Sequence, residues 1–189
     1  MFRHVTMMMT VMVMAAMAHA AGPAIGDRAP SFELTDQNGN MVSLDQFKGK
    51  VVVLEWFNDG CPVTKQHHTA PAKTMSTLAD KYKADGVVWL AINSTRTTSV
   101  EKNKKAAERF GVEYPVLDDS AGKVGQAYGA RCTPHMFVID ARGMLAYNGA
   151  IDDRKSTNYI AKAVDELLAG KPVSTPQTKP YGCGIKYAK

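Results

Sequence analysis

The residues best suited to chemistry in this sequence are its three cysteines, Cys61, Cys132 and Cys183. Cys61 follows a short turn and stands directly before Pro62, a residue that favours the first position of a helix. A thiol at the start of a helix meets the positive end of the helix dipole and unpaired N–H groups, and both stabilise the thiolate. Because the thiolate is the reactive form, this pattern predicts that Cys61 is a nucleophile.

A thiol that takes part in redox chemistry needs a second thiol to resolve its product, and two are available. Cys132 comes two residues before Pro134, just before an apolar run, where a cis peptide bond is favoured. Cys183 is flanked by glycines that let the backbone adapt to a disulfide. We expect Cys183 to be the resolving cysteine. Cys132 is the weaker resolving candidate and otherwise packs as a small apolar residue.

The Cys61 and Cys183 pair also allows a purely structural interpretation. A permanent disulfide between them would close a long loop and contribute on the order of 5 kcal/mol in the chain-entropy model. A redox pair and a structural disulfide are therefore both hypotheses at this point.

Apolar runs predict the strands that position these cysteines. Val51–Phe57 and Val87–Ile92 are continuous runs of β-branched and aromatic residues, which are typical of strands buried on both faces. Met136–Ile139 is followed by a turn and then by Met144–Tyr147, so this pair predicts a β-hairpin.

The segments between these apolar runs have the spacing of apolar residues, or the capping pattern, that is typical of helices. Apolar residues recur at helical spacing over residues 63–82, where Pro71 should kink or break the helix. Thr98 with Glu101 three residues later forms a capping-box pattern, which predicts a helix from Thr98 to Gly111.

A final helix is expected over residues 157–168. Strands and helices that alternate, followed by a hairpin and a helix, predict an α/β fold with a central mixed β-sheet. This domain should cover residues 21–170. Residues 171–189 are rich in Pro, Thr and Lys and lack apolar periodicity, so they predict an extended C-terminal tail that carries Cys183.

The N-terminal residues have the pattern of a secretory signal peptide over residues 1–20. A basic start leads into the apolar run Val5–Met17, and Ala18, His19 and Ala20 form an A-x-A cleavage site. The run is shorter than the roughly 20 residues that span a bilayer. We therefore expect an exported protein of the bacterial periplasm, with no stable membrane association after cleavage, in a compartment that permits disulfides.

Composition excludes several classes of protein. The chain is 45% hydrophobic and 22% charged, which is ordinary for a globular protein and unlike disordered, collagenous or multi-span membrane chains. Its net charge of +5 comes from scattered basic residues rather than a stripe, so nucleic-acid binding is not expected.

Two motifs carry a resemblance to a known family. Gly60-Cys61-Pro62 at a helix start, and Thr133-Pro134 before a strand, resemble the thioredoxin fold, a three-layer sandwich, over residues 25–168. The likeness is to its redoxin branch, the AhpC/TSA superfamily that includes peroxiredoxins, and within it to exported proteins with a C-terminal Pro-Tyr-Gly-Cys, here residues 180–183. The resemblance implies that Cys61 is the attacking or peroxidatic cysteine, and that Pro134 is a cis-proline beside it.

The chain departs from the family at two positions. Peroxiredoxins carry Thr three residues before the attacking cysteine, and Asn58 stands there. Thioredoxins carry a second cysteine three residues after the first, and Thr64 stands there, so a C-x-x-C cycle is excluded. The residues expected to support the site are Asn58, Gly60, Pro62, Thr64, Thr133 and Pro134.

These inferences predict an exported, thiol-dependent, peroxiredoxin-like oxidoreductase with antioxidant activity and no cofactor. Cys61 would attack a peroxide oxygen or a disulfide sulfur, and Cys183 would resolve the sulfenic acid or mixed disulfide. An external thiol reductant would complete turnover.

The alternative is a module that binds copper or a protein and carries a structural Cys61–Cys183 disulfide. Cys61, His68 and His135 together offer ligands for a soft metal. Exported copper carriers with this fold resemble the chain loosely, but Lys65 stands where they place a second cysteine.

Overall fold

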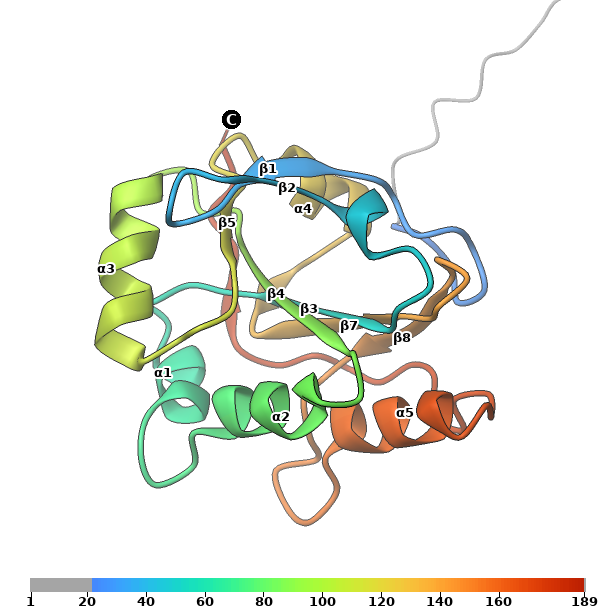
Figure 1. Ribbon diagram of the computed structural model, residues 1–189. Coiled ribbons are helices and arrows are strands. Elements are labelled where there is room, and N and C mark those ends of the chain that lie inside the picture. Colours follow the sequence, from blue (N-terminus) through green and yellow to red (C-terminus); the bar gives the residue numbers. More distant parts are fainter. Residues whose placement is uncertain (1–21, 189) are drawn as a thin grey trace, which may run out of the picture.

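The computed structural model describes residues 22–188, so the expected signal peptide lies outside the described residues (Figure 1). None of the described helices is long and apolar enough to cross a membrane. In chain order the elements are β1 (Glu33–Thr35), β2 (Met41–Ser43), the 3-10 helix η1 (Leu44–Phe47), β3 (Val52–Trp56), α1 (Pro62–His68), α2 (Thr74–Lys83), β4 (Val88–Asn93), α3 (Val100–Phe110), β5 (Val116–Asp118), α4 (Lys123–Tyr128), β6 (Cys132–Thr133), β7 (His135–Ile139), β8 (Leu145–Gly149), α5 (Tyr159–Leu168) and β9 (Cys183–Gly184).

A seven-stranded sheet forms the centre, with strand order β2-β1-β5-β4-β3-β7-β8. Strands β3, β4 and β5 are parallel, whereas β7 and β8 add antiparallel at one edge and β1 and β2 at the other. The apolar runs therefore form adjacent strands as expected, and β7 and β8 form the predicted hairpin. The mixed sheet inferred from the sequence is confirmed.

The sheet is covered on both faces. Strand β3 is buried along its whole length because its side chains alternate between two cores. Leu54 packs in the cluster that includes Tyr128 of α4, and Val53 packs in the cluster formed with α2 and α5. Figure 1 shows α1, α2 and α5 together on one side of the sheet and α4 on the other. The fold is the expected three-layer sandwich.

The three predicted helical segments are present, with small shifts in their ends. The periodic segment at residues 63–82 is split into α1 and α2 around Pro71, as its ring predicts. Helix α3 ends at Gly111, which adopts a left-handed conformation with φ of 63°. The last helix begins later than predicted because Asn158 is its N-cap and accepts the Ala161 N–H at 2.8 Å.

The predicted cap of α3 is wrong by one residue. Ser99, not Thr98, caps the helix: its hydroxyl oxygen accepts the Lys102 N–H at 3.3 Å and its O–H donates to Glu101 at 2.8 Å. The Thr98 hydroxyl is used elsewhere, because it donates to the buried Asn103 side chain at 2.8 Å. The N-cap therefore lies one residue later than predicted, and the predicted capping box between Thr98 and Glu101 does not form.

The C-terminal tail, residues 171–188, lies against the domain. In Figure 1 it runs in red from α5 back along the sheet to the end marked C. The Thr178 N–H donates to the Asn148 carbonyl at 3.1 Å, and the Ile185 N–H donates to the Arg131 carbonyl at 3.2 Å. Between these contacts β9 pairs antiparallel with β6, so backbone hydrogen bonds fix the tail on both sides of Cys183.

The tail approaches the loop before β7 so closely that residue 182 has to be glycine. Gly182 has φ of 137°, and a Cβ added there would lie 2.0 Å from the Thr133 carbonyl oxygen. A Cβ at Gly184 would meet no atom within 4 Å. The two glycines beside Cys183 therefore differ: only the first is required by packing.

We expect Gly182→Ala to separate β9 from β6 and Gly184→Ala to leave the pair intact. The amide of Ile185 is the reporter, because its hydrogen bond to Arg131 depends on the docked tail. Loss of that bond and its neighbours, each about 1 kcal/mol, should speed hydrogen exchange at Ile185 by at least about tenfold in Gly182→Ala. Equal exchange rates in the two variants would contradict the steric argument.

Candidate active site

Cys61 lies where the central strand β3 passes through a turn into helix α1. Asn58 closes this turn: its Oδ1 accepts the Gly60 N–H at 2.8 Å, and its carbonyl accepts the Cys61 N–H at 3.0 Å. Cys61 is the N-cap of α1 and Pro62 is the first helical residue, as their order in the sequence predicts. Asn58 therefore holds the turn that places the thiol at the helix N-terminus.

The Cys61 thiol is enclosed by the loop before β7 and by the tail, and the residue is only 2% exposed. Its Sγ lies 2.8 Å from the Sγ of Cys183, and it donates to the Thr133 carbonyl oxygen at 3.0 Å. The Thr133–Pro134 peptide bond is cis, and Thr133 stands opposite Cys183 in the β6–β9 pair. Three segments that are distant in sequence thus meet at one sulfur atom.

The pKa values of the two thiols move in opposite directions. Burial raises the pKa of Cys61, but hydrogen bonds from the Cys183 thiol and the Thr64 backbone N–H outweigh burial and lower it to about 7. The same bond to Cys61, with burial, raises the pKa of Cys183. Cys61 is therefore the thiolate near neutral pH, and Cys183 is the proton donor beside it.

Cys132 is set apart from this pair. In the β6–β9 register it stands opposite Gly184, whereas its neighbour Thr133 stands opposite Cys183. Successive side chains of a strand point to opposite faces, so Cys132 and Cys183 do not face each other. Burial raises the pKa of Cys132 to about 11, and its Sγ lies 3.6 Å from the Pro134 carbonyl. The geometry favours Cys183 over Cys132 as the partner of Cys61.

A buried polar cluster lies beneath α1 and was not inferred from the sequence. His68 Nε2 lies 2.6 Å from Glu55 Oε1, and both side chains are fully buried. The other Glu55 oxygen accepts hydrogen bonds from Trp89 Nε1 at 3.4 Å and from the Tyr114 hydroxyl at 3.0 Å. A glutamate inside the otherwise apolar run of β3 was the one sequence signal of this cluster. Its contacts tie α1 to the sheet beneath it.

The residues considered for a metal are not assembled as a site. The Nε2 atom of His68 is occupied by Glu55. His135 Nε2 bonds to Asn148 at 2.7 Å, and its Nδ1 accepts the Arg131 N–H at 3.3 Å. Burial lowers the pKa of His135 to about 4. Within residues 22–188 no three His, Cys, Asp or Glu side chains gather in a way that would hold a metal ion.

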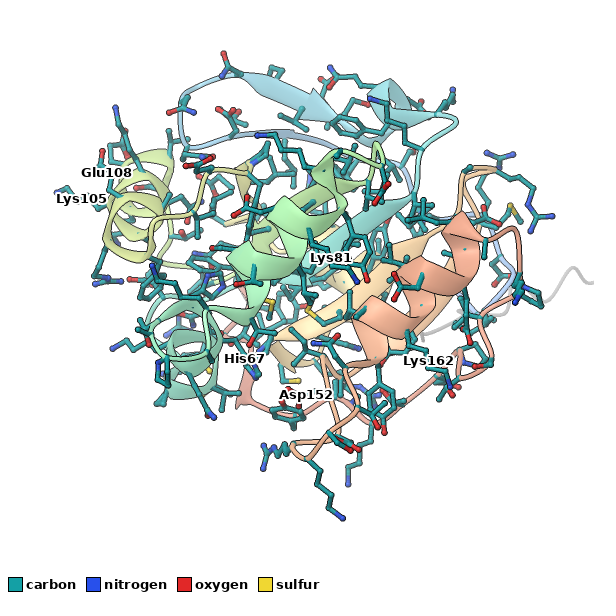
Figure 2. All side chains as sticks on the ribbon, turned by 60° about the horizontal axis from the view of Figure 1, so that its bottom comes forward. His67, Lys81, Lys105, Glu108, Asp152 and Lys162 are labelled. Carbon is teal, nitrogen blue, oxygen red and sulfur yellow. The ribbon has the colours of Figure 1, made fainter. Side chains whose placement is uncertain are left out.

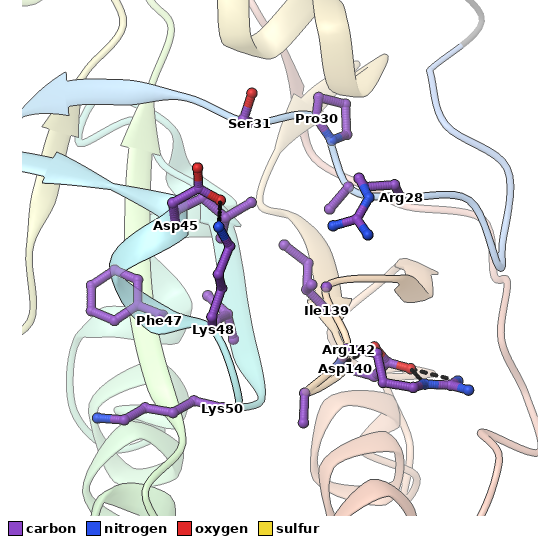
Figure 3. A pocket seen from close by; sticks show the side chains of 15 residues that line it. Arg28, Pro30, Ser31, Asp45, Phe47, Lys48, Lys50, Ile139, Asp140 and Arg142 are labelled. Atoms are coloured by element: carbon purple, nitrogen blue, oxygen red, sulfur yellow. Dashed lines mark hydrogen bonds and ion pairs between the residues drawn. The ribbon is translucent and has the colours of Figure 1, made fainter.

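A cavity of about 590 Å³ lies at the opposite end of the sheet (Figure 3). It includes Val52 and Ile139, which are the start of β3 and the end of β7. Cys61 follows the other end of β3. The cavity is therefore separate from the thiol site.

These features define the class of protein: a mixed α/β sandwich with a cysteine at the helix N-cap after its central strand, facing a cis-proline loop, is a thioredoxin-fold redoxin. Residues 25–148 match the model of the AhpC/TSA family. The chain belongs to this family.

Several known proteins are similar to this chain. Thiol-disulfide oxidoreductase ResA of Bacillus thuringiensis subsp. konkukian (strain 97-27) is 33% identical over 122 residues, which cover 64% of this chain and 66% of ResA. The match thus spans just under two thirds of that relative. A crystal structure of a hypothetical protein from Sinorhizobium meliloti 1021 aligns with a TM-score of 0.79 and 29% identity, covering 88% of this chain and 96% of that one. A conserved protein from Geobacillus kaustophilus aligns with a TM-score of 0.78 and 34% identity, covering 87% and 93%.

The lowered pKa predicts when Cys61 reacts. With a pKa of about 7, roughly half of Cys61 is thiolate at neutral pH, against about one part in a hundred for a thiol with the ordinary value of 9.0. In the reduced protein the rate of Cys61 alkylation by iodoacetamide should rise with a midpoint near pH 7, followed by mass spectrometry. In Cys183→Ala, which lacks the donating thiol, the midpoint should move toward pH 9. A midpoint that stays in place would show that Cys183 does not set the pKa.

Proposed function

We propose that this protein is a thiol-disulfide oxidoreductase in which Cys61 is the attacking cysteine and Cys183 the resolving one. One observation carries the proposal: the Cys61 Sγ, with its pKa lowered to about 7, lies 2.8 Å from the Cys183 Sγ. The name of the relative ResA supports disulfide chemistry in the same family. Asn58, Gly60 and Pro62 shape the turn. The Thr64 N–H and the Thr133 carbonyl hydrogen-bond with the Cys61 sulfur, and Pro134 forms the cis peptide bond that follows Thr133.

The reaction proceeds in two exchanges. The Cys61 thiolate attacks one sulfur of the substrate disulfide, forms a mixed disulfide and releases the first substrate thiolate. Cys183 then loses its proton to solvent and attacks the Cys61 sulfur, which releases the second substrate thiolate and forms the Cys61–Cys183 disulfide. The substrate gains two electrons and the protein loses two. An external thiol reductant restores both cysteines.

A peroxide is the second candidate substrate, and the burial of Cys61 favours it. With the tail in place the residue is only 2% exposed, so a small oxidant reaches the thiol more readily than a bulky one. The thiolate would attack one peroxide oxygen to give Cys61 sulfenic acid and release water or an alcohol. Cys183 would then condense with the sulfenic acid to give the same disulfide and a water molecule.

We place this activity in the periplasm of a bacterium, after removal of residues 1–20. The A-x-A pattern at residues 18–20 supports export, and an oxidising compartment suits a protein that cycles through a disulfide. An antioxidant role follows if peroxide is the substrate.

Mapping the cysteines after oxidation tests the proposal. The reduced mature protein is mixed with one equivalent of glutathione disulfide or, separately, hydrogen peroxide, and its cysteines are identified by mass spectrometry. We expect a Cys61–Cys183 disulfide in the wild type and in Cys132→Ser. Cys183→Ser should instead accumulate glutathionylated Cys61 or Cys61 sulfenic acid, because the resolving thiol is missing.

Two outcomes would overturn the proposal. If Cys61 remains a thiol for many minutes with both oxidants, the protein is not an oxidoreductase of this kind. If the Cys61–Cys183 disulfide resists millimolar dithiothreitol in the folded protein, it is a structural bond rather than a redox pair.

A further inference from the structure

Tyr181, two residues before Cys183, is tied to two separate parts of the domain. Its hydroxyl donates to Asp152 Oδ1 at 2.6 Å, and its oxygen lies 3.1 Å from His67 Nε2. Since the single hydroxyl proton goes to Asp152, the oxygen accepts the N–H of His67. Burial lowers the pKa of His67, which favours the neutral ring that this arrangement uses. Figure 2 shows the labelled His67 and Asp152 near each other, and both contact the Tyr181 hydroxyl.

The ring of Tyr181 is held as well as its hydroxyl. The Arg154 guanidinium carbon lies 3.9 Å from the ring centroid, in a cation–π contact. Arg154 has φ of 59°, in the left-handed region, and its N–H donates to Asp152 Oδ1 at 3.0 Å. We call Tyr181, His67, Asp152 and Arg154 the tail clamp. Because Arg154 is hydrogen-bonded to Asp152, the groups that contact the Tyr181 hydroxyl and ring are also bound to each other.

The tail clamp connects Cys183 to the helix that carries Cys61. His67 belongs to α1, and Cys61 is the N-cap of the same helix. Between Tyr181 and Cys183 there is only Gly182, a residue with the greatest backbone freedom. Tyr181 therefore adds a side-chain contact next to the β6–β9 pairing that holds the tail at Cys183.

We propose that Tyr181 is a positioning residue for the resolving step: the tail clamp holds the Cys183 thiol against the Cys61 sulfur and so sets the rate at which the mixed disulfide is resolved. This inference rests on the proposed function. Attack on the substrate by Cys61 depends on the clamp only indirectly, through the Cys183 thiol that helps to lower the Cys61 pKa, whereas attack by Cys183 depends directly on where the clamp holds its sulfur. The two steps should therefore respond differently to removal of the hydroxyl.

The aromatic disulfide dithionitrobenzoate separates the two steps, since each releases one coloured thiolate. One equivalent is mixed with the reduced full-length mature protein in a stopped-flow instrument. The first equivalent of thiolate reports attack by Cys61, and the second reports attack by Cys183 on the mixed disulfide. In Tyr181→Phe, which keeps the ring over Arg154, we expect the second rate to be at least about fivefold slower than in wild type and to fall by a larger factor than the first.

Tyr187→Phe is the matched control. Tyr187 is also a tail tyrosine, and its hydroxyl donates to the Ala130 carbonyl at 2.7 Å on the other side of Cys183. Its second rate should stay within about twofold of wild type. If both variants slow the second step equally, or if Tyr181→Phe leaves it unchanged, Tyr181 has no positioning role.

Two further variants make the test specific. Asp152→Ala should also slow the second step, and the double variant should be no slower than Tyr181→Phe alone, because Tyr181→Phe already removes the hydrogen bond to Asp152. Additive slowing would overturn the clamp. Cys183→Ser tests the proposed function separately: release of two equivalents by this variant would show that Cys183 is not the resolving thiol, whatever the clamp does.

Discussion

The contact between the sulfur atoms of Cys61 and Cys183 is the constraint on which the arrangement of the site depends. One sulfur is fixed by the turn from β3 into α1, and the other by a strand of only two residues, β9, on the edge of β6. Neither position is a consequence of the other. The close approach of Gly182 to the Thr133 carbonyl brings them together, because it leaves no space for a side chain between tail and loop.

The hydrogen bond between the two thiols also gives them different roles. It lowers the pKa of the sulfur that accepts and raises the pKa of the sulfur that donates. The helix N-terminus acts on both sulfur atoms: the Thr64 N–H lowers the pKa of Cys61, and the Val63 N–H lowers that of Cys183, where the bond to Cys61 and burial outweigh it. The hydrogen bond between the thiols therefore makes Cys61 the more acidic of the two, which supports the proposed role of Cys61 in attack.

Features set by local sequence could be predicted, and features set by distant contacts could not. Pro62 marks the start of α1, Gly111 the end of α3 and Pro71 the break between α1 and α2, because each acts through its own backbone. The cap at Thr98 was misplaced because a contact with Asn103 decided between two adjacent hydroxyls. The tail offers no apolar period, so its docking by backbone pairing and by Tyr181 had no local signal to reveal it.

The raised pKa of Cys183 looks unfavourable for a resolving nucleophile, but its position compensates for it. A higher pKa lowers the fraction of thiolate at neutral pH by a factor of ten for each unit. A thiol held in an intramolecular near-attack position, however, reacts as if present at an effective concentration on the order of 10⁵ M or more. An external thiol would need a comparable concentration to compete, so Cys183 would react faster than an external thiol even after a large loss of thiolate. In the proposed reaction, the rate of resolution therefore depends more on how firmly the tail holds Cys183 than on how acidic that cysteine is.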